Sequence, residues 1–276
     1  NLFDPQNGIN DLKEKKIKFI GESSKRIEED YLRIIRFIRF SIHYNNIVSD
    51  SDIITSIKIN LNGVKHLSKE RILNELYKIF NLKNLNVLLD NKDIKNIFLL
   101  IFPEFKYLER LDKLINLIND KTVQQIPDFI FPALLIDEKD NHEYFCHKYK
   151  VSNKLKKELN LISGNYINYK KNKNLLKKNL KENIYRFGKN NIKNLIYFIF
   201  CAEKNFTKNL LEKNIKQIDQ IELPKFPFKG QYLINQGITD GKKIGYALKE
   251  LEKEWIQKDF KLSTTDAISI IEKIKN

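Results

Sequence analysis

From residue 22 onward, apolar residues recur at helical spacing and never settle into the alternation that a β-strand requires. The clearest case lies within residues 28–44, where one face of the predicted helix would carry Ile34, Ile35, Ile38 and Ile42. The pattern therefore predicts an all-α protein. The exception is residues 1–21, which are interpreted as two short extended pieces around a turn at Gly8, so a short β segment is expected at the N-terminus.

The same periodicity predicts further helices, which would cover residues 52–61, 68–81, 93–102, 104–118 and 129–136. Ser68 and Ser152 are predicted N-caps, because a serine that precedes an apolar-periodic run can accept a hydrogen bond from a first-turn N–H. Asp50 is predicted to cap the helix over 52–61. Capping explains the triplet Asp50-Ser51-Asp52 better than a metal site does, since no glycine turn and no alternating strand precedes it.

Residues 222–228 contain two prolines and are predicted to form an extended linker. Beyond it, four glycines surround a short helix, a turn and a longer helix: Gly230, Gly237, Gly241 and Gly245. Two interpretations are open here. The helix N-terminal amides near residues 237–245 could bind a phosphate, or the glycines could simply form the turns of a helix hairpin.

The net charge of +15, from 50 Lys and Arg against 35 Asp and Glu, predicts attraction to a polyanion such as a nucleic acid. An AT-rich genome would also enrich a chain in Lys, Asn and Ile without selection for binding. The densest basic stretch contains Lys170, Lys171, Lys173, Lys177 and Lys178. These lysines are candidates for RNA phosphate contacts, and the alternative is a solvated helix face.

With 276 residues, the chain has room for two or three small helical domains. The longest uninterrupted apolar run, residues 195–202, is too short to span a bilayer, so no membrane association is expected. Cys146 and Cys201 do not form a disulfide framework, which suits a cytoplasmic location. Cys146 with His142 and His147 also makes a poor zinc ligand set, and no metal site is predicted.

The stretch from Glu29 to Arg33, EDYLR, combines an acceptor with a fork of donors. Asp30 and Arg33 are three residues apart, so on a helix their side chains would be neighbours on one face. A carboxylate accepts from an exocyclic amino group, and a guanidinium donates to a ring acceptor. Cytosine and adenine offer that pair of groups on one edge, whereas uracil and guanine offer the reverse. The pair could therefore select C and A, or it could be the charged outer face of an amphipathic helix.

Three separate segments favour the first interpretation. Residues 4–12 follow the pattern DPxxGxxDL, residues 29–40 follow EDxxRxxRxxRF, and residues 70–76 follow ERxxxEL. In this order they resemble motifs C, D and E of the class II tRNA nucleotidyltransferases, which comprise the CCA-adding enzymes and the bacterial poly(A) polymerases. Residues 149–155, 185–189 and 237–256, the last with the pattern GIxxGxxIGxxLxxLExxWI, resemble the alphaproteobacterial branch of the same family.

The resemblance implies specific roles for these residues. The nucleotide-binding residues would be Asp30 and Arg33, which read the base, with Glu29 orienting Arg33 and Arg36 supporting the site. The hinge between the catalytic head and the helical part would include Asp4, Gly8 and Asp11. Glu70 and Arg71 would brace the helices that hold the reading segment.

The resemblance also implies a domain order. Residues 1–21 would be a remnant of the catalytic head and the hinge, 22–82 the neck, 83–221 the helical body and 222–276 the helical tail. The family reaction adds C, C and A to tRNA 3′ ends, so the expected partners are tRNA, CTP and ATP. The sequence makes no prediction of oligomeric state.

The family's catalytic head, with its metal-binding carboxylates, has no counterpart in these residues. We therefore expect a chain that begins after the head, with Mg²⁺ held by the missing head and no catalysis from this part alone. Two alternatives remain. One is a poly(A) polymerase or an enzyme that adds only part of CCA, and the other is a non-catalytic helical RNA-binding protein derived from the fold.

Overall fold

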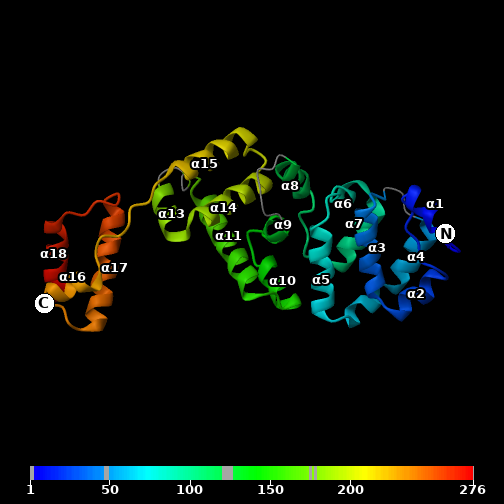
Figure 1. Cartoon of the computed structure of the whole chain (residues 1–276), viewed down its shortest axis with the longest axis horizontal. Coiled ribbons are helices and arrows are strands. Elements are labelled where there is room, and N and C mark those ends of the chain that lie inside the picture. Colours follow the sequence, from blue (N-terminus) through cyan, green and yellow to red (C-terminus); the bar gives the residue numbers. More distant parts are fainter. Residues whose placement is uncertain (1–2, 47–49, 120–126, 174–175, 177–178, 276) are drawn as a thin grey trace. The chain divides into compact units, whose positions relative to one another are not determined.

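The computed structural model describes residues 3–46, 50–119, 127–173, 176 and 179–275. All regular structure in this part of the chain is helical, which confirms the all-α prediction (Figure 1). The chain divides into two compact units. The first comprises Asn1–Leu176 with Asn190–Ile215, and the second comprises Lys177–Lys189 with Lys216–Asn276. No helix among the described residues is long and apolar enough to cross a membrane.

The first unit contains the helices of the N-terminal two-thirds of the chain. They are α1 (Gly8–Lys13), α2 (Ser23–Glu29), α3 (Leu32–His43), α4 (Ser51–Asn60), the 3-10 helix η1 (Leu61–His66), α5 (Lys69–Phe80), α6 (Val87–Asp90), α7 (Lys92–Ile101), α8 (Arg110–Asn119), α9 (Pro127–Leu135), α10 (Asn141–Tyr149) and α11 (Asn153–Lys171). Most of α14 (Lys189–Ala202) and the first half of α15 (Lys208–Gln220) complete it.

A cluster of fully buried phenylalanines holds the middle of this unit together. Its members are Phe80, Phe98, Phe102, Phe105, Phe131 and Phe145. The ring of Phe105 lies within 6.2 Å, centroid to centroid, of the other five. Burial of each phenylalanine contributes about 1.5–3 kcal/mol, so the cluster joins α5, α7, α9 and α10 into one core. The helix expected from residue 104 begins only at Arg110, and Glu104 and Phe105 precede it in an irregular turn, where both are buried.

Residues 28–44 do not form the single helix that was predicted. Helix α2 ends at Glu29 and α3 begins at Leu32, and between them Asp30 is extended, with φ −156° and ψ 101°. The Asp30 carboxylate accepts a hydrogen bond of 3.1 Å from the Leu32 N–H. An aspartate that bonds the backbone in this way competes with helix continuation, which explains the break.

The short β segment expected within residues 1–21 is absent from residues 3–21. Instead Gly8–Lys13 is helical, and the Asp4 carboxylate accepts from the N–H groups of Gly8 and Ile9 at 2.7 and 2.9 Å. These bonds satisfy two of the amides that are left without partners at a helix start. A strand would need a neighbouring strand for its amides, and the described residues contain none.

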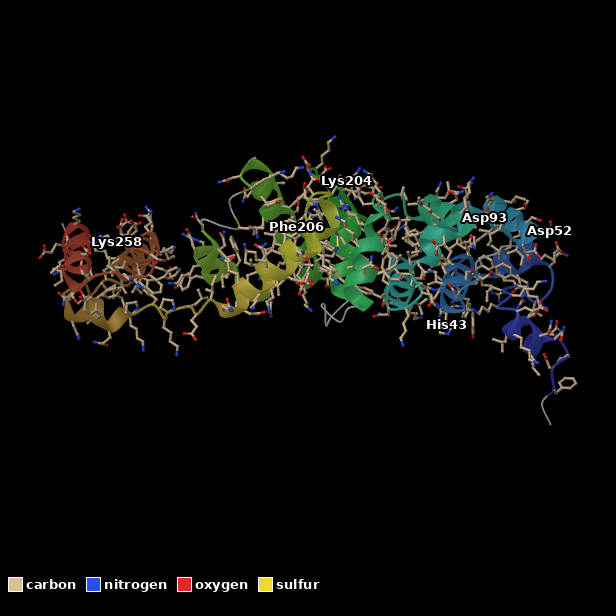
Figure 2. The ribbon with its side chains drawn as sticks, turned by 90° about the horizontal axis from the view of Figure 1, so that it is seen from above. His43, Asp52, Asp93, Lys204, Phe206 and Lys258 are labelled. Carbon is tan, nitrogen blue, oxygen red and sulfur yellow. The ribbon has the colours of Figure 1, made fainter. Side chains whose placement is uncertain are left out.

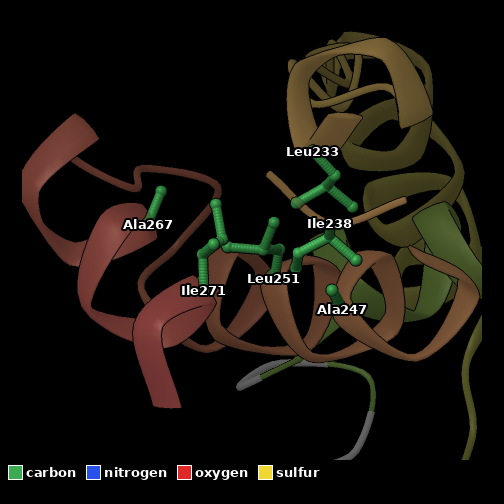
Figure 3. Close-up of a cluster of buried hydrophobic side chains, with 6 residues drawn as sticks. All are labelled: Leu233, Ile238, Ala247, Leu251, Ala267 and Ile271. Atoms are coloured by element: carbon green, nitrogen blue, oxygen red, sulfur yellow. The ribbon is translucent and has the colours of Figure 1, made fainter. Parts of the chain in front are cut away.

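The second unit contains α13 (Leu180–Phe187), α16 (Gly230–Asn235), α17 (Gly241–Gln257) and α18 (Thr264–Lys275). Six buried side chains form its core: Leu233, Ile238, Ala247, Leu251, Ala267 and Ile271 (Figure 3). Tyr185 joins α13 to this unit through ring contacts with Trp255 and Phe260, both at 5.5 Å between centroids. The predicted linker over 222–228 has no helix, as expected, and its Phe226 packs on Trp255.

Candidate functional site

The residues around the α2–α3 break form a small network of charges. The Glu29 carboxylate lies between two guanidinium groups: Arg26 Nη1 is 2.7 Å from both oxygens, and Arg33 Nη1 is 2.8 Å from Oε2. Desolvation acts to raise the pKa of Glu29, but the hydrogen bonds from Arg33 and Arg26 outweigh it and hold the pKa below its usual value. Glu29 is therefore ionised at neutral pH and available to orient both arginines.

Arg33 is anchored through only one of its nitrogens. Its Nη1 donates to the Glu29 carboxylate and, at 2.6 Å, to the Arg26 carbonyl oxygen. These two bonds use both hydrogens of Nη1. A guanidinium has five N–H donors, and within the described residues Nε and Nη2 make no hydrogen bond. The anchored face thus leaves three donors for a ligand.

Asp30 is held by a different arginine, Arg71, on the first turn of α5. Arg71 Nη2 lies 3.1 Å from Oδ1 and 2.9 Å from Oδ2. The Leu32 N–H also bonds Oδ1, while Arg36 approaches Oδ2 only to 4.0 Å. A carboxylate has about four lone-pair sites, so acceptor capacity remains at Oδ2.

The spacing predicted that Asp30 and Arg33 would share one helix face. They do not, because Asp30 precedes α3. Their proximity is set by the backbone instead, since the Arg33 N–H donates to the Asp30 carbonyl at 3.0 Å. Glu29 contacts Arg33 as the resemblance implied. Sequence reasoning missed Arg26, whose signal was its spacing of three residues from Glu29 on a helix.

Arg71 and Glu75 are four residues apart on α5, a spacing that favours an ion pair, but Arg71 pairs with Asp30 instead. Glu75 is only 2% exposed and pairs with other cations. Its carboxylate lies 2.8 Å from Arg39 Nε, an approach without hydrogen-bond alignment, and 2.9 Å from Lys78 Nζ. Arg36 Nε is 3.7 Å away. Arg36 thus lies between Asp30 and Glu75 and links the two carboxylates electrostatically.

The other predicted motif residues occupy local structural positions. Asp4 begins α1 by accepting from the Gly8 amide, and Asp11 on α1 pairs with Lys18. Glu70 is exposed in the first turn of α5, where the helix dipole stabilises a negative charge.

The basic stretch is only partly available to a ligand. Lys170 lies 3.2 Å from Glu138 and 3.3 Å from Glu203, so it is engaged within the unit. Lys171 and Lys173 are exposed. Lys177 and Lys178 lie outside the described residues.

Two candidate ligand sites from the sequence are explained by helix capping. Asp50 accepts from the amides of Asp52 and Ile53, as predicted, and Asp52 itself is exposed at the start of α4 (Figure 2). In the second unit, Asp240 accepts from the amides of Lys242 and Lys243 at 2.8 and 2.9 Å. These are the amides that a phosphate near residues 237–245 would require, so the helix-hairpin interpretation fits better. The described part of the chain contains no group of three or more His, Cys, Asp or Glu placed to hold a metal ion.

Sequence comparison relates nearly all of this chain to CCA-adding enzymes, although no family model matches it. Human mitochondrial CCA tRNA nucleotidyltransferase 1 is 29% identical over 286 residues, which cover 99% of this chain and 62% of the human protein. The CCA-adding enzyme of Staphylococcus haemolyticus is 28% identical over 266 residues, which cover 92% of this chain and 62% of that protein. The family resemblance is thereby confirmed, and the chain spans about 62% of the length of these relatives.

Solved structures show the same fold. A CCA-adding enzyme in complex with CTP superposes with a TM-score of 0.61 at 20% identity, covering 98% of this chain and 64% of that one. The Thermotoga maritima CCA-adding enzyme in complex with tRNA gives a TM-score of 0.58 at 20% identity, covering 98% of this chain and 66% of that one. The helical arrangement described above is therefore shared with these enzymes along nearly the whole chain.

Proposed function

We propose that this chain is the C-terminal portion of a CCA tRNA nucleotidyltransferase, in which it selects CTP and ATP and binds tRNA for addition of CCA to the 3′ end. The observation that carries the proposal is the anchoring of Arg33 and Asp30 at the α2–α3 break. Arg33 presents unused donors and Asp30 presents a remaining acceptor site. Both lie on a segment that resembles a motif of the CCA-adding enzymes, in a chain whose relatives are such enzymes.

The selection of nucleotides follows from hydrogen-bond polarity. Asp30 accepts from the exocyclic amino group of cytosine or adenine, and Arg33 donates to the adjacent unprotonated ring nitrogen. Uracil and guanine place a carbonyl oxygen against Asp30 and an N–H against Arg33, so both contacts become repulsive. Glu29 and the Arg26 carbonyl hold Arg33 in place, and Arg71 holds Asp30. Because both side chains are already held, they lose little conformational entropy when a nucleotide binds.

We further propose that the body and tail bind tRNA through shape and phosphate contacts rather than by reading bases. The net charge of +15 supports this role, and exposed lysines such as Lys171 and Lys173 provide positive charge at the surface. Residues 1–21, 22–82, 83–221 and 222–276 would serve as head remnant and hinge, neck, body and tail. The human relative is named as mitochondrial, so the cytoplasmic location expected from the sequence stays a prediction.

The phosphoryl transfer itself would use Mg²⁺ held by carboxylates outside these 276 residues. The fragment alone should accordingly bind tRNA in a salt-dependent manner and add no nucleotide. Purified residues 1–276 can be incubated with tRNA, Mg²⁺ and labelled CTP. Incorporation above background would contradict this part of the proposal.

Nucleotide choice tests the central claim. In the full-length protein, Arg33→Ala should lose roughly 1–3 kcal/mol of discrimination between CTP or ATP and UTP or GTP, the range for one bidentate base contact. Arg186→Ala is a matched control, because Arg186 also pairs with a glutamate four residues earlier, Glu182, on an exposed helix face. Incorporation of all four nucleotides is measured under competition. Equal selectivity of Arg33→Ala and wild type would refute the base-reading role.

A further inference from the structure

Gly63, in the 3-10 helix η1, lies directly against the ring of Tyr31. A β-carbon added to Gly63 would stand 2.0 Å from Tyr31 Cε1, 2.1 Å from Cδ1 and 2.4 Å from Cγ. These distances are far below any normal carbon–carbon contact. Gly63 is buried, and its backbone is not in the left-handed region. The position therefore requires glycine for space and not for conformation.

The ring of Tyr31 has little freedom to move away. The overlap includes Cγ, the atom that attaches the ring to the rest of the side chain, so rotation of the ring about its own axis does not relieve it. Relief would need a different χ1 rotamer or a shift of the Tyr31 backbone. That backbone is the α2–α3 break itself, because Tyr31 lies between Asp30 and the first residue of α3.

The segment that carries Gly63 also leads to the partners of the break. Helix η1 is followed by α5, whose first turn carries Arg71, and Arg71 bonds Asp30. On the other side of η1, Asn60 at the end of α4 donates to Ser24 Oγ in the first turn of α2 at 2.8 Å. In sequence, Gly63 thus lies between Asn60 and Arg71, whose polar links join the same two chain segments as the Tyr31–Gly63 contact.

We propose that Gly63 is a positioning residue for nucleotide selection. By admitting the Tyr31 ring, it sets the backbone at residues 30–33 and so the relative placement of the Asp30 acceptor and the Arg33 donors. Gly63 itself touches no nucleotide. The proposal rests on the function proposed above, because the readout is the choice between nucleotides that carry an amino group beside an unprotonated ring nitrogen and those that do not.

The contact can be tested apart from any activity by a double-mutant cycle in the full-length protein. Gly63→Ala should lower the thermal unfolding midpoint by roughly 3–10 °C, because overpacking is destabilising. The same change should cost little in a Tyr31→Ala background, where the ring is gone. Gly164→Ala is the matched control: Gly164 lies in α11, and a β-carbon added there would have no neighbouring atom within 4 Å, so alanine should not lower the midpoint. Equal costs of Gly63→Ala with and without Tyr31 would overturn the contact.

Nucleotide selectivity then tests the positioning role. Gly63→Ala and Tyr31→Ala should each reduce the preference for CTP and ATP over UTP and GTP by about tenfold. Tyr31→Phe and Gly164→Ala should keep it. The assays are made below the unfolding transition of each variant, and Tyr31→Ala supplies the answer if Gly63→Ala does not fold. A selective wild type with equally selective Tyr31→Ala and Gly63→Ala variants overturns the positioning role alone. A wild type without nucleotide preference instead overturns the proposed function, and the positioning role with it.

Discussion

Arg71 on α5 and Asp30 at the α2–α3 break are 41 residues apart in sequence, yet Arg71 Nη2 lies within 3.1 Å of both Asp30 carboxylate oxygens. Arg71 therefore fixes the acceptor that we propose to read the base. In that proposal, a nucleotide that approaches Asp30 meets a carboxylate already oriented by Arg71.

Removal of Arg71 should affect selectivity more than stability. Arg71→Ala should cost about 0.5–1 kcal/mol of folding free energy, since the pair is partly exposed. The preference for CTP and ATP should fall more strongly than that, because Asp30 loses its orientation. Lys25→Ala, which removes an exposed pair with Glu22 on the neighbouring α2, is the control. The measurements are urea unfolding and competitive nucleotide incorporation, and retained selectivity in Arg71→Ala would count against the role of this pair.

Charge reversal at the C-terminal end of α11 and just beyond it should separate RNA-binding lysines from structural ones. Lys171→Glu with Lys173→Glu should weaken tRNA binding and reduce the salt slope of log Kd by about 0.7–0.9 for each phosphate that the variant no longer neutralises. Lys156→Glu with Lys157→Glu, at the other end of the same helix, is the matched control. An unchanged slope for the Lys171 and Lys173 variant would identify these lysines as a solvated face.

Lys170→Glu should behave differently from its neighbours. Lys170 pairs with Glu138 and Glu203, so reversal places three carboxylates together and destabilises the first unit. The expected result is a larger fall in the unfolding midpoint for Lys170→Glu than for the variant of Lys171 and Lys173, because Lys170 contacts both glutamates directly. Scanning calorimetry of both variants checks it, and equal midpoints would show that the Lys170 ion pairs contribute nothing to stability.

The phenylalanine cluster predicts a large and local stability effect. Phe105→Ala should cost about 3–5 kcal/mol of unfolding free energy, because it leaves a cavity among five other rings. Phe105→Leu should cost less, since most of the volume is kept. Phe3→Ala, at a side chain that is 87% exposed, should change stability by less than about 0.5 kcal/mol. The measurement is denaturant unfolding. Equal losses of unfolding free energy in Phe105→Ala and Phe3→Ala would contradict the stabilising role of the cluster.

Glu203 should contribute to the loss of stability in acid. Burial acts to raise its pKa, but hydrogen bonds from Tyr166 and Lys170 outweigh burial and lower the pKa below the usual 4.5. Because the folded-state pKa is the lower one, the stabilisation is present above about pH 4.5 and is lost as the pH falls through the folded-state value. Glu203→Gln should therefore lose less stability than wild type between about pH 6 and pH 3. Glu109→Gln, at an exposed position, is the control. Parallel pH profiles of Glu203→Gln and wild type would contradict the prediction.

The sequence by itself determined the helical class, the order of the family motifs and several helix starts. Asp50, Ser68 and Ser152 cap the helices that they were expected to cap. These features depend on residues within about four positions of one another, where spacing alone decides which groups can meet. The contact between Glu29 and Arg33, also four residues apart, was expected only from the family resemblance.

Only the tertiary structure decided the pairing of Asp30 with Arg71 and the contact of Tyr31 with Gly63. Each depends on partners that are distant in sequence or on competition between them. Local spacing favoured an Arg71–Glu75 pair, for example, but Arg71 is engaged by Asp30 and Glu75 by Arg39 and Lys78. Periodicity places a side chain on a face, whereas packing of one segment against another chooses which of several possible charge partners it meets.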